Sequence, residues 1–313
     1  MLALTLASLV VTPLVHSSKV GFDSAISHLS VREFDMLSAA KRHMTTVFNL
    51  WKRVGTKETL VQVGDAVGHM AMRHPRGFRV PTLAELDDAA AETFQVPFEL
   101  LRAVCPNACD AVSSSVIEKE YGDLRDELES RYEKRSLPYD RNWAIESASS
   151  MIVYGLTRLL KPQVIVETGV ANGHSSFLLL KAIEMNGDGH LHSVDVGKNV
   201  GGLIDTGERA NWYLHVLNPR NARSELTHVL DSIGDVEMFI HDSDHRYSWQ
   251  KIELELAAQV LNERGIIACD DADASFAFVD FARRHGKRSL LLIDRRKVFG
   301  VIPWRGIEPS GHL

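Results

Sequence analysis

The sequence has few cysteines, no excess of positive charge and no apolar run long enough to span a membrane. Three cysteines, Cys105, Cys109 and Cys269, are too few and odd in number for a disulfide framework, which favours a reducing compartment, the cytoplasm. The net charge is -6 with acids and bases interspersed, so we expect no nucleic-acid partner. Residues 2–15 are apolar but too short for a membrane span, and no Lys or Arg precedes them. We interpret them as a buried helix, with a cleaved export signal as the alternative, and expect no membrane partner.

The chain has 313 residues, of which 45% are hydrophobic, enough for a substantial core. Residues 1–112 read mainly as helix and loop, with a capping box at Thr82 and Glu85. Acids followed by bases in residues 118–135 predict a solvated helix face. We therefore predict a helical N-terminal region over 1–112, acting as a lid or as an arm for a homo-oligomer, and a catalytic domain over 113–313.

Short apolar runs alternate with helical patterns after residue 142, which predicts a doubly wound α/β domain. We expect buried parallel strands at 163–168, 190–194, 226–230, 236–241 and 265–269. Helices are expected at 175–185 and 250–262, with Gly265 as a left-handed cap of the second.

Two further apolar runs, 288–293 and 297–302, are separated by only three residues. So short a link requires an antiparallel pair, because a parallel crossover needs a dozen or more residues. A mostly parallel sheet that ends in an antiparallel hairpin resembles the class I methyltransferase fold, which implies a seven-stranded, Rossmann-like sheet.

The first predicted strand leads into a turn rich in small residues, ETGVANGHS, and then a helix. An acidic residue, Glu167, followed by Gly169 and Gly173, resembles the first methyltransferase motif, with Ala171 in the place of the middle glycine. The resemblance implies S-adenosylmethionine as methyl donor, bound by Glu167, Gly169, Gly173 and Ser175. Gly-rich turns also bind dinucleotides, and some only pack a helix on a sheet.

Acidic residues end the next two predicted strands. Asp195 can accept hydrogen bonds from ribose hydroxyls, which S-adenosylmethionine and NAD share. Asp231 and Ser232 follow the strand expected at 226–230, and the resemblance implies contact with the adenine ring, although Asp231 could instead cap a turn.

Three carboxylates follow the last two predicted parallel strands. Asp242 ends one strand, and the pair Asp270 and Asp271 ends its neighbour 28 residues later. Ligands gather at the carboxyl ends of strands in such sheets, so these side chains can converge. Clustered carboxylates repel one another unless a cation neutralises them, and oxygen ligands favour a hard ion such as Mg²⁺ or another divalent cation.

The stretch FIHDSDH, followed by the acidic pair at this spacing, is similar to metal-dependent O-methyltransferases, including those that act on sugars of macrolide and aminocoumarin antibiotics. The resemblance covers roughly residues 140–302. It implies Asp242, Asp270 and Asp271 as metal ligands and His245 as general base. Catechol-type relatives have Lys in the place of His245 and Asn as third ligand, so this chain resembles the sugar branch. Asp244 stands where an apolar or small residue is expected.

Three functions are compatible with these patterns. The first is metal-dependent methylation of a hydroxyl on a small sugar or glycosylated metabolite, with catechol-type O-methylation as its variant. The second is a nicotinamide-dependent oxidoreductase, supported by the Gly-rich turn and Asp195 but not by the hairpin or the three carboxylates. The third is a non-catalytic scaffold, against which the complete set of site residues counts.

Overall fold

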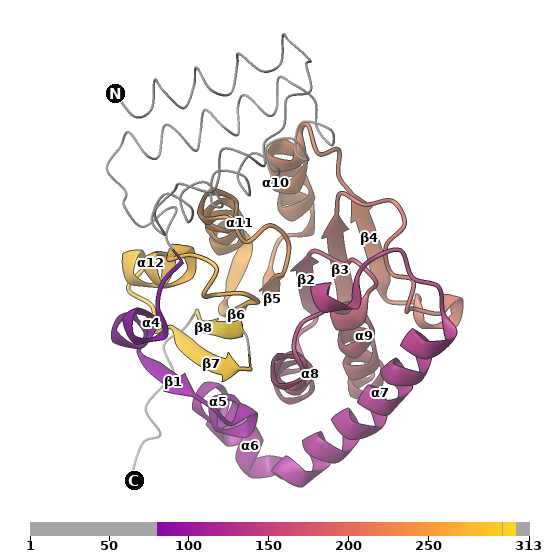
Figure 1. Cartoon of the computed structure of the whole chain (residues 1–313), viewed down its shortest axis with the longest axis horizontal. Coiled ribbons are helices and arrows are strands. Elements are labelled where there is room, and N and C mark those ends of the chain that lie inside the picture. Colours follow the sequence, from indigo (N-terminus) through magenta and orange to yellow (C-terminus); the bar gives the residue numbers. More distant parts are fainter. Residues whose placement is uncertain (1–79, 296, 305–313) are drawn as a thin grey trace, which may run out of the picture. The chain divides into compact units, whose positions relative to one another are not determined.

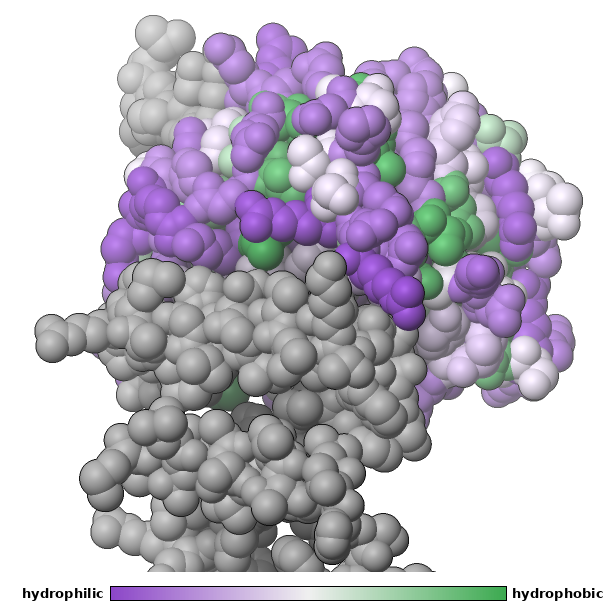
Figure 2. Space-filling view, turned by 90° about the horizontal axis from the view of Figure 1, so that it is seen from above, coloured by the Kyte–Doolittle hydropathy of each residue, from purple (hydrophilic) through white to green (hydrophobic). Residues whose placement is uncertain are grey.

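The structure of the chain is a computed structural model that describes residues 80–295 and 297–304. All of these residues belong to one compact unit. The helix expected within residues 2–15 lies outside them. No helix in the described ranges is long and apolar enough to cross a membrane. Figure 2 shows one face, on which hydrophobic side chains of the described residues lie in small groups among hydrophilic ones.

The described residues form a single eight-stranded sheet in the order β1-β7-β8-β6-β5-β2-β3-β4 (Figure 1). All neighbouring strands run parallel except β8, which is antiparallel to both β6 and β7. The strands are β1 (Glu92–Phe94), β2 (Val164–Thr168), β3 (His190–Asp195), β4 (Trp212–Val216), β5 (Val236–His241), β6 (Leu261–Cys269), β7 (Leu290–Asp294) and β8 (Lys297–Pro303). The predicted α/β sheet with its antiparallel C-terminal hairpin is confirmed.

Helices cover both faces of the sheet and bury two apolar clusters against it (Figure 1). One face carries α5 (Pro97–Val104), α6 (Pro106–Ala111), α7 (Ser114–Lys134), α8 (Ser147–Leu160) and α9 (His174–Asn186). The other carries α4 (Leu83–Ala89), α10 (Ala222–Ile233), α11 (Tyr247–Val260) and α12 (Ala277–Arg284). The predicted capping box at the start of α4 is present, with Thr82 and Glu85 bonded reciprocally.

The strand order reverses direction between β2 and β5. From β2 the chain moves outward through β3 and β4, and from β5 it moves the opposite way to β6. Such a switch point leaves a crevice at the carboxyl ends of the strands, where ligands of open α/β sheets bind. The turn after β2 and the acidic residues after β5 and β6 lie at this edge.

The strand predicted at 226–230 is wrong, because these residues belong to α10. Leu226 and Leu230 recur four residues apart and are both buried, as the inner face of a helix requires. The strand that follows β3 in the chain is instead β4, at the edge of the sheet. Its side chains are largely exposed, so that its sequence lacks the apolar run of a buried strand.

Two further predictions on segment ends are corrected. Helix α11 ends at Val260, and Gly265 is not its left-handed cap but a residue within β6. A Cβ on Gly265 would lie 2.4 Å from the Cγ of Leu261, so glycine permits close packing there.

The predicted boundary at residue 112 does not separate two domains. Strand β1 comes from the N-terminal side of that boundary and pairs in parallel with β7, adding an eighth strand to the seven expected. Leu101 of α5 is fully buried in the same cluster as residues of α8 and α9. Residues 80–112 are therefore part of the core of the catalytic unit.

We predict that Leu101→Ala lowers the free energy of unfolding by about 2–5 kcal/mol, because it opens a cavity in a packed core. A Cβ on Gly155 of α8 would lie 2.6 Å from the Cδ1 of Leu101, so the two helices are in direct contact. Urea denaturation followed by tryptophan fluorescence measures the change. Leu83→Ala, at an exposed residue of α4, is the control. An unchanged midpoint for Leu101→Ala would show that α5 does not belong to this folding unit.

Candidate active site at the carboxyl edge of the sheet

Main-chain hydrogen bonds continue beyond the ends of the strands and hold the site segments side by side. Three of them, each of 2.8 or 2.9 Å, are Gly169 N to Val194 O, Asp242 N to Thr168 O, and Asp270 N to His241 O. The Gly-rich turn, Asp242 and Asp270 are thus fixed at one edge by the backbone itself. The predicted convergence of these segments is present in the structure.

The Gly-rich turn after β2 lies directly against the backbone of Asp242. Gly169 has φ +88°, and a Cβ there would lie 1.8 Å from the carbonyl oxygen of Asp242. Gly173, also at φ +88°, precedes α9, and a Cβ on it would lie 2.9 Å from the Cα of Gly201. Only glycine permits both the left-handed backbone and these contacts. A ligand on this turn would therefore adjoin the acidic residues.

Glu167, in the strand that precedes the turn, connects this strand to α9 and β3 by hydrogen bonds. It is fully buried and accepts hydrogen bonds from the hydroxyls of Ser175 at 2.9 Å, Ser193 at 2.6 Å and Ser176. Burial raises the pKa of Glu167 to about 7, although the three hydroxyls favour its ionised form. The structure brings Glu167 and Ser175 together, and both are occupied with each other rather than open to solvent.

Asp195 ends β3, as predicted, and binds the backbone of the turn. Its Oδ2 accepts from the N–H groups of Val170 at 2.8 Å and Ala171 at 3.3 Å, and its Oδ1 from Gly197 at 2.6 Å. This carboxylate therefore joins the ends of β2 and β3. Four lone pairs on a carboxylate leave acceptor capacity for a ligand as well.

Asn172 and the segment before α8 form a clamp on the turn that sequence reasoning missed. The side chain of Asn172 accepts from Tyr139 N at 3.2 Å and donates to Tyr139 O at 2.9 Å. The ring of Tyr139 packs on that of Trp143, with centroids 5.6 Å apart. The clamp could not be found from the sequence, since a lone Asn in a loop has many uses.

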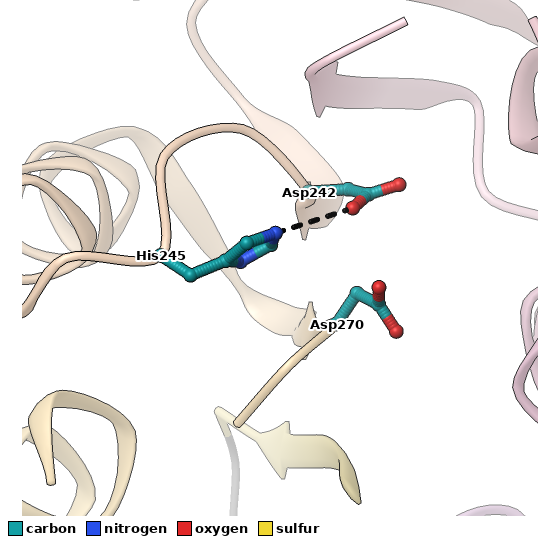
Figure 3. A group of neighbouring side chains, drawn as sticks. All are labelled: Asp242, His245 and Asp270. Atoms are coloured by element: carbon teal, nitrogen blue, oxygen red, sulfur yellow. Dashed lines mark ion pairs between the residues drawn. The ribbon is translucent and has the colours of Figure 1, made fainter. Parts of the chain in front are cut away.

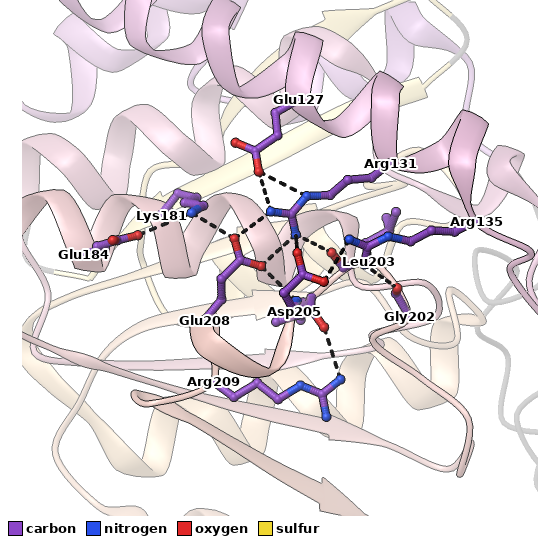
Figure 4. Close-up of polar contacts among 11 residues, drawn as sticks. Glu127, Arg131, Arg135, Lys181, Glu184, Gly202, Leu203, Asp205, Glu208 and Arg209 are labelled. Atoms are coloured by element: carbon purple, nitrogen blue, oxygen red, sulfur yellow. Dashed lines mark hydrogen bonds and ion pairs between the residues drawn. The ribbon is translucent and has the colours of Figure 1, made fainter.

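A buried arginine of α7 secures the loop that flanks the turn (Figure 4). Arg131 donates to Glu208 at 2.6 and 2.7 Å and to the carbonyl oxygen of Leu203 at 2.6 Å. Leu203 N in turn donates to Asn172 O at 2.9 Å. Residues 118–135 were predicted as a solvated face, but Arg131 is only 9% exposed. Its hydrogen bonds with Glu208 explain why a charged side chain is buried here.

Asp231 and Ser232 do not lie at this edge, which corrects their assignment to the adenine site. They belong to the last turn of α10, and β5 begins three residues after that helix ends. They are therefore near the amino end of β5, at the edge of the sheet opposite to the one that carries the Gly-rich turn and the acidic residues. The segment that follows β4 at the carboxyl edge begins with Leu217, whose N–H donates to Asp195 O at 2.8 Å.

Asp242, His245 and Asp270 form a group whose ligand atoms all lie within 4.8 Å of one another (Figure 3). His245 Nε2 is 3.8 Å from Asp242 Oδ1. Asp270 is fully buried, and its Oδ1 has no hydrogen-bond partner among residues 80–295 and 297–304. A buried carboxylate oxygen without a partner is costly in an apolar interior, and a bound cation would satisfy it.

Asp271 and Lys297 complete the cluster. Asp271 adopts a left-handed backbone, φ +47°, and its Oδ2 lies 3.3 Å from His245 Nε2. Lys297, at the start of β8, places its Nζ 2.9 Å from Asp270 Oδ2 and 3.2 Å from Asp271 Oδ2. The sequence offers no signal for Lys297, because only the pairing of β8 with β6 brings it to the acidic pair.

The charges in this cluster perturb one another strongly. Burial, and then the charge of Asp270, raise the pKa of Asp242, and burial with Asp271 raises that of Asp270 to about 6. Burial opposes the charge of Lys297, but Asp270 and Asp271 outweigh it and raise the Lys297 pKa. The single positive charge of Lys297 is thus too small to neutralise three ionised carboxylates.

His245 has a nitrogen directed at the acidic residues and is held by its neighbours. Burial, and then the nearby His241, lower the pKa of His245 to about 4, which favours neutral imidazole. The rings of His241 and His245 meet edge to face at 5.4 Å. His241 Nδ1 in turn lies 2.6 Å from the buried carboxylate of Glu253, which also accepts from Ser243 at 2.8 Å.

Asp244, which had no explanation in the sequence, does not join the acidic cluster. Its carboxylate pairs with the guanidinium of Arg246 and accepts from Arg246 N at 3.1 Å, just before α11 begins. It therefore shapes the turn that leads into the helix.

The segments of this site fall within a match to a known protein family. Residues 166–272, from β2 to the acidic pair, match the family described as a methyltransferase domain. No curated protein matches the chain. Solved structures with some similarity include the S-adenosylhomocysteine-bound methyltransferase PaMTH1 of Podospora anserina, with 13% identity, a TM-score of 0.45, and 58% of this chain and 87% of that chain covered. A methyltransferase from Geobacter sulfurreducens has 16% identity, a TM-score of 0.43 and 59% and 88% coverage. The O-methyltransferase TomG from Streptomyces achromogenes, in complex with S-adenosylmethionine, has 17% identity and a TM-score of 0.41, with 53% of this chain and 83% of that chain covered.

The matched residues and the sheet point to the same class of fold. Residues 166–272 match a methyltransferase domain, and the sheet has the mostly parallel order with an antiparallel C-terminal pair that was predicted for the class I fold. The predicted fold is confirmed, and the matched domain supports the predicted enzyme class.

We predict that Gly169→Ala destabilises the protein by roughly 3 kcal/mol or more, because its Cβ would overlap the Asp242 backbone. Gly187→Ala is the matched control, since Gly187 has a similar φ of +82° but nothing within 4 Å of an added Cβ. That variant should lose only about 1 kcal/mol. Equal losses in urea denaturation would contradict the close approach of the turn to Asp242.

Proposed function

We propose that this chain is an S-adenosylmethionine-dependent O-methyltransferase that uses a divalent cation, Mg²⁺ or another, to methylate a hydroxyl of a small sugar or glycosylated metabolite. The observation that carries the proposal is the unpartnered buried oxygen of Asp270 beside Asp242 and His245, directly next to the Gly-rich turn. A donor on the turn and an acceptor at the acidic cluster would then be neighbours.

The donor would lie on the turn formed by Gly169 and Gly173, with Asp195 accepting from its ribose hydroxyls. Glu167 and Ser175 would act from below by fixing the turn, given that they bond each other. The backbone N–H groups at the start of α9 and the small residues of the turn suit a close approach of ligand to backbone.

The residues present fit a divalent cation. Asp242, Asp270 and Asp271 offer hard oxygen ligands, and Asp270 Oδ1 lacks another partner in the part of the chain that the structure describes. When bound there, such a cation would make an alcohol more acidic and stabilise negative charge on its oxygen. Asp242 is held by its N–H bond to Thr168 O, so this ligand is fixed by the sheet.

His245 would accept the proton of the hydroxyl at Nε2, which is directed toward the acidic residues. The protein's remaining task is alignment. Because Gly169 abuts the backbone of Asp242, the turn and the cluster can hold the oxygen, the methyl carbon and the sulfur in line.

The sugar acceptor is supported by the motif FIHDSDH with His245 and Asp271, in which the chain resembles the sugar branch rather than catechol-type enzymes. A catechol-type acceptor is the alternative. Activity screens with glycosides and catechols, each with and without EDTA, separate the two. We also propose the cytoplasm as compartment, a proposal supported by three free thiols at Cys105, Cys109 and Cys269.

A nicotinamide-dependent oxidoreductase would share the Gly-rich turn and Asp195 but would have no use for the acidic cluster. Thermal shift assays with S-adenosylhomocysteine and with NADH distinguish the two functions. Stabilisation by NADH alone would refute the methyltransferase proposal.

We predict that Asp242→Asn weakens Mn²⁺ binding at least tenfold, measured by electron paramagnetic resonance, because a charged oxygen ligand is lost. Methyl transfer to an identified acceptor should fall in parallel, whereas the affinity for S-adenosylhomocysteine should change little. The matched control is Asp244→Asn, since Asp244 pairs with Arg246 outside the cluster. Activity that survives both Asp242→Asn and EDTA would exclude a metal mechanism.

We predict that His245→Gln lowers kcat by about 10²–10⁴-fold, the range for loss of a general base. The Kd for Mn²⁺ should change less than about threefold, since a base is not a ligand. A collapse of Mn²⁺ affinity instead would make His245 a ligand, as its distance to Asp242 also allows.

A further inference from the structure

Lys297 contacts two of the three residues that are proposed as metal ligands. Its ammonium bonds Oδ2 of both Asp270 and Asp271, two of the three proposed ligands. Only 16% of the Lys297 side chain is exposed, so this contact is largely shielded from water. A shielded ion pair is screened far less than a surface pair.

The backbone fixes Lys297 beside the acidic pair. Val298 N donates to Asp273 Oδ1 at 3.0 Å, and Ala272 N donates to Val298 O at 2.8 Å. In the hairpin, Lys297 of β8 lies opposite Asp294 of β7 in the strand register. The side chain of Asp294 accepts a hydrogen bond from Ser149 N at 2.7 Å. The base of the lysine side chain is therefore tied to the loop after β6 and to α8, while its long side chain retains rotatable bonds.

The two oxygens of Asp270 differ in their surroundings. Oδ2 is held by Lys297, whereas Oδ1 is buried without a partner near Asp242 and His245. The cluster is thus unevenly neutralised: Lys297 contacts Asp270 and Asp271, whereas the partner of Asp242 among the described side chains is His245, 3.8 Å away. A cation bound by all three aspartates would also draw on the charge of Asp271, whose Oδ2 is now shared by Lys297 and His245.

We propose that Lys297 is a built-in competitor for the metal: its ammonium holds Asp270 and Asp271 when the divalent cation is absent and must leave them when the cation binds. This inference rests on the proposed function. Lys297 thereby keeps the ligands together in the metal-free protein and weakens metal affinity, so that the site responds to the concentration of free divalent cation. The exchange requires only that one side chain rotates, since β8 itself stays paired.

The test is the variant Lys297→Met, which keeps an unbranched side chain of similar length but removes the charge. We expect it to bind Mn²⁺ at least tenfold more tightly than the unmodified protein, measured by electron paramagnetic resonance in the full chain. Lys161→Met is the charge-matched control, because Lys161 is exposed and precedes β2 at the opposite edge of the sheet. It should leave Mn²⁺ affinity unchanged.

A second measurement covers folding. In EDTA, Lys297→Met should melt at a lower temperature, because three carboxylates then lack a counter-charge, and Mn²⁺ should raise its melting temperature more than that of the unmodified protein. Equal or weaker Mn²⁺ binding by Lys297→Met would overturn the competitor role while leaving the metal site itself intact. Mn²⁺ binding by neither protein would instead refute the proposed metal site, and the competitor role with it.

Discussion

Concentrated negative charge at one edge of the sheet is the constraint around which this site is built. Parallel strands deliver their carboxyl ends to the same edge, and β5 and β6 end in Asp242, Asp270 and Asp271. Burial, and then the charge of the neighbouring carboxylates, raises the cost of ionising Asp242 and Asp270, so that their pKa values rise. Such an edge persists only if positive charge reaches it, and Lys297 from β8 supplies part of it.

The close approach of two backbones connects this charge to the rest of the fold. Gly169 and Asp242 come so near that no side chain fits between them. Hydrogen bonds of three side chains, those of Glu167, Asp195 and Asn172, hold the Gly-rich turn in position. Arg131 of α7 then secures the flanking loop through Glu208. Polar contacts from four separate segments thus hold one short turn in place, which is the preorganisation that in-line group transfer demands.

Local patterns in the sequence predicted most of the sheet and the position of the site. The buried strands β2, β3, β5 and β6 are short apolar runs, and the three-residue link of the hairpin allows only an antiparallel pair. These features depend on neighbours in sequence, and so they can be read from it. Strand β4 was missed because an exposed edge strand has no apolar run, and β1 because three residues carry too little signal. The error at β4 carried over to Asp231 and Ser232.

The sequence by itself determined which acidic residues end which strands, and hence that Asp242, Asp270 and Asp271 share an edge with the Gly-rich turn. Strand alternation and turn chemistry are local properties, which explains this success. Only the tertiary structure decided that Lys297 meets the acidic pair and that Arg131 is buried. Partners of long charged side chains depend on contacts between distant segments, and the same lysine or arginine in sequence could equally face water.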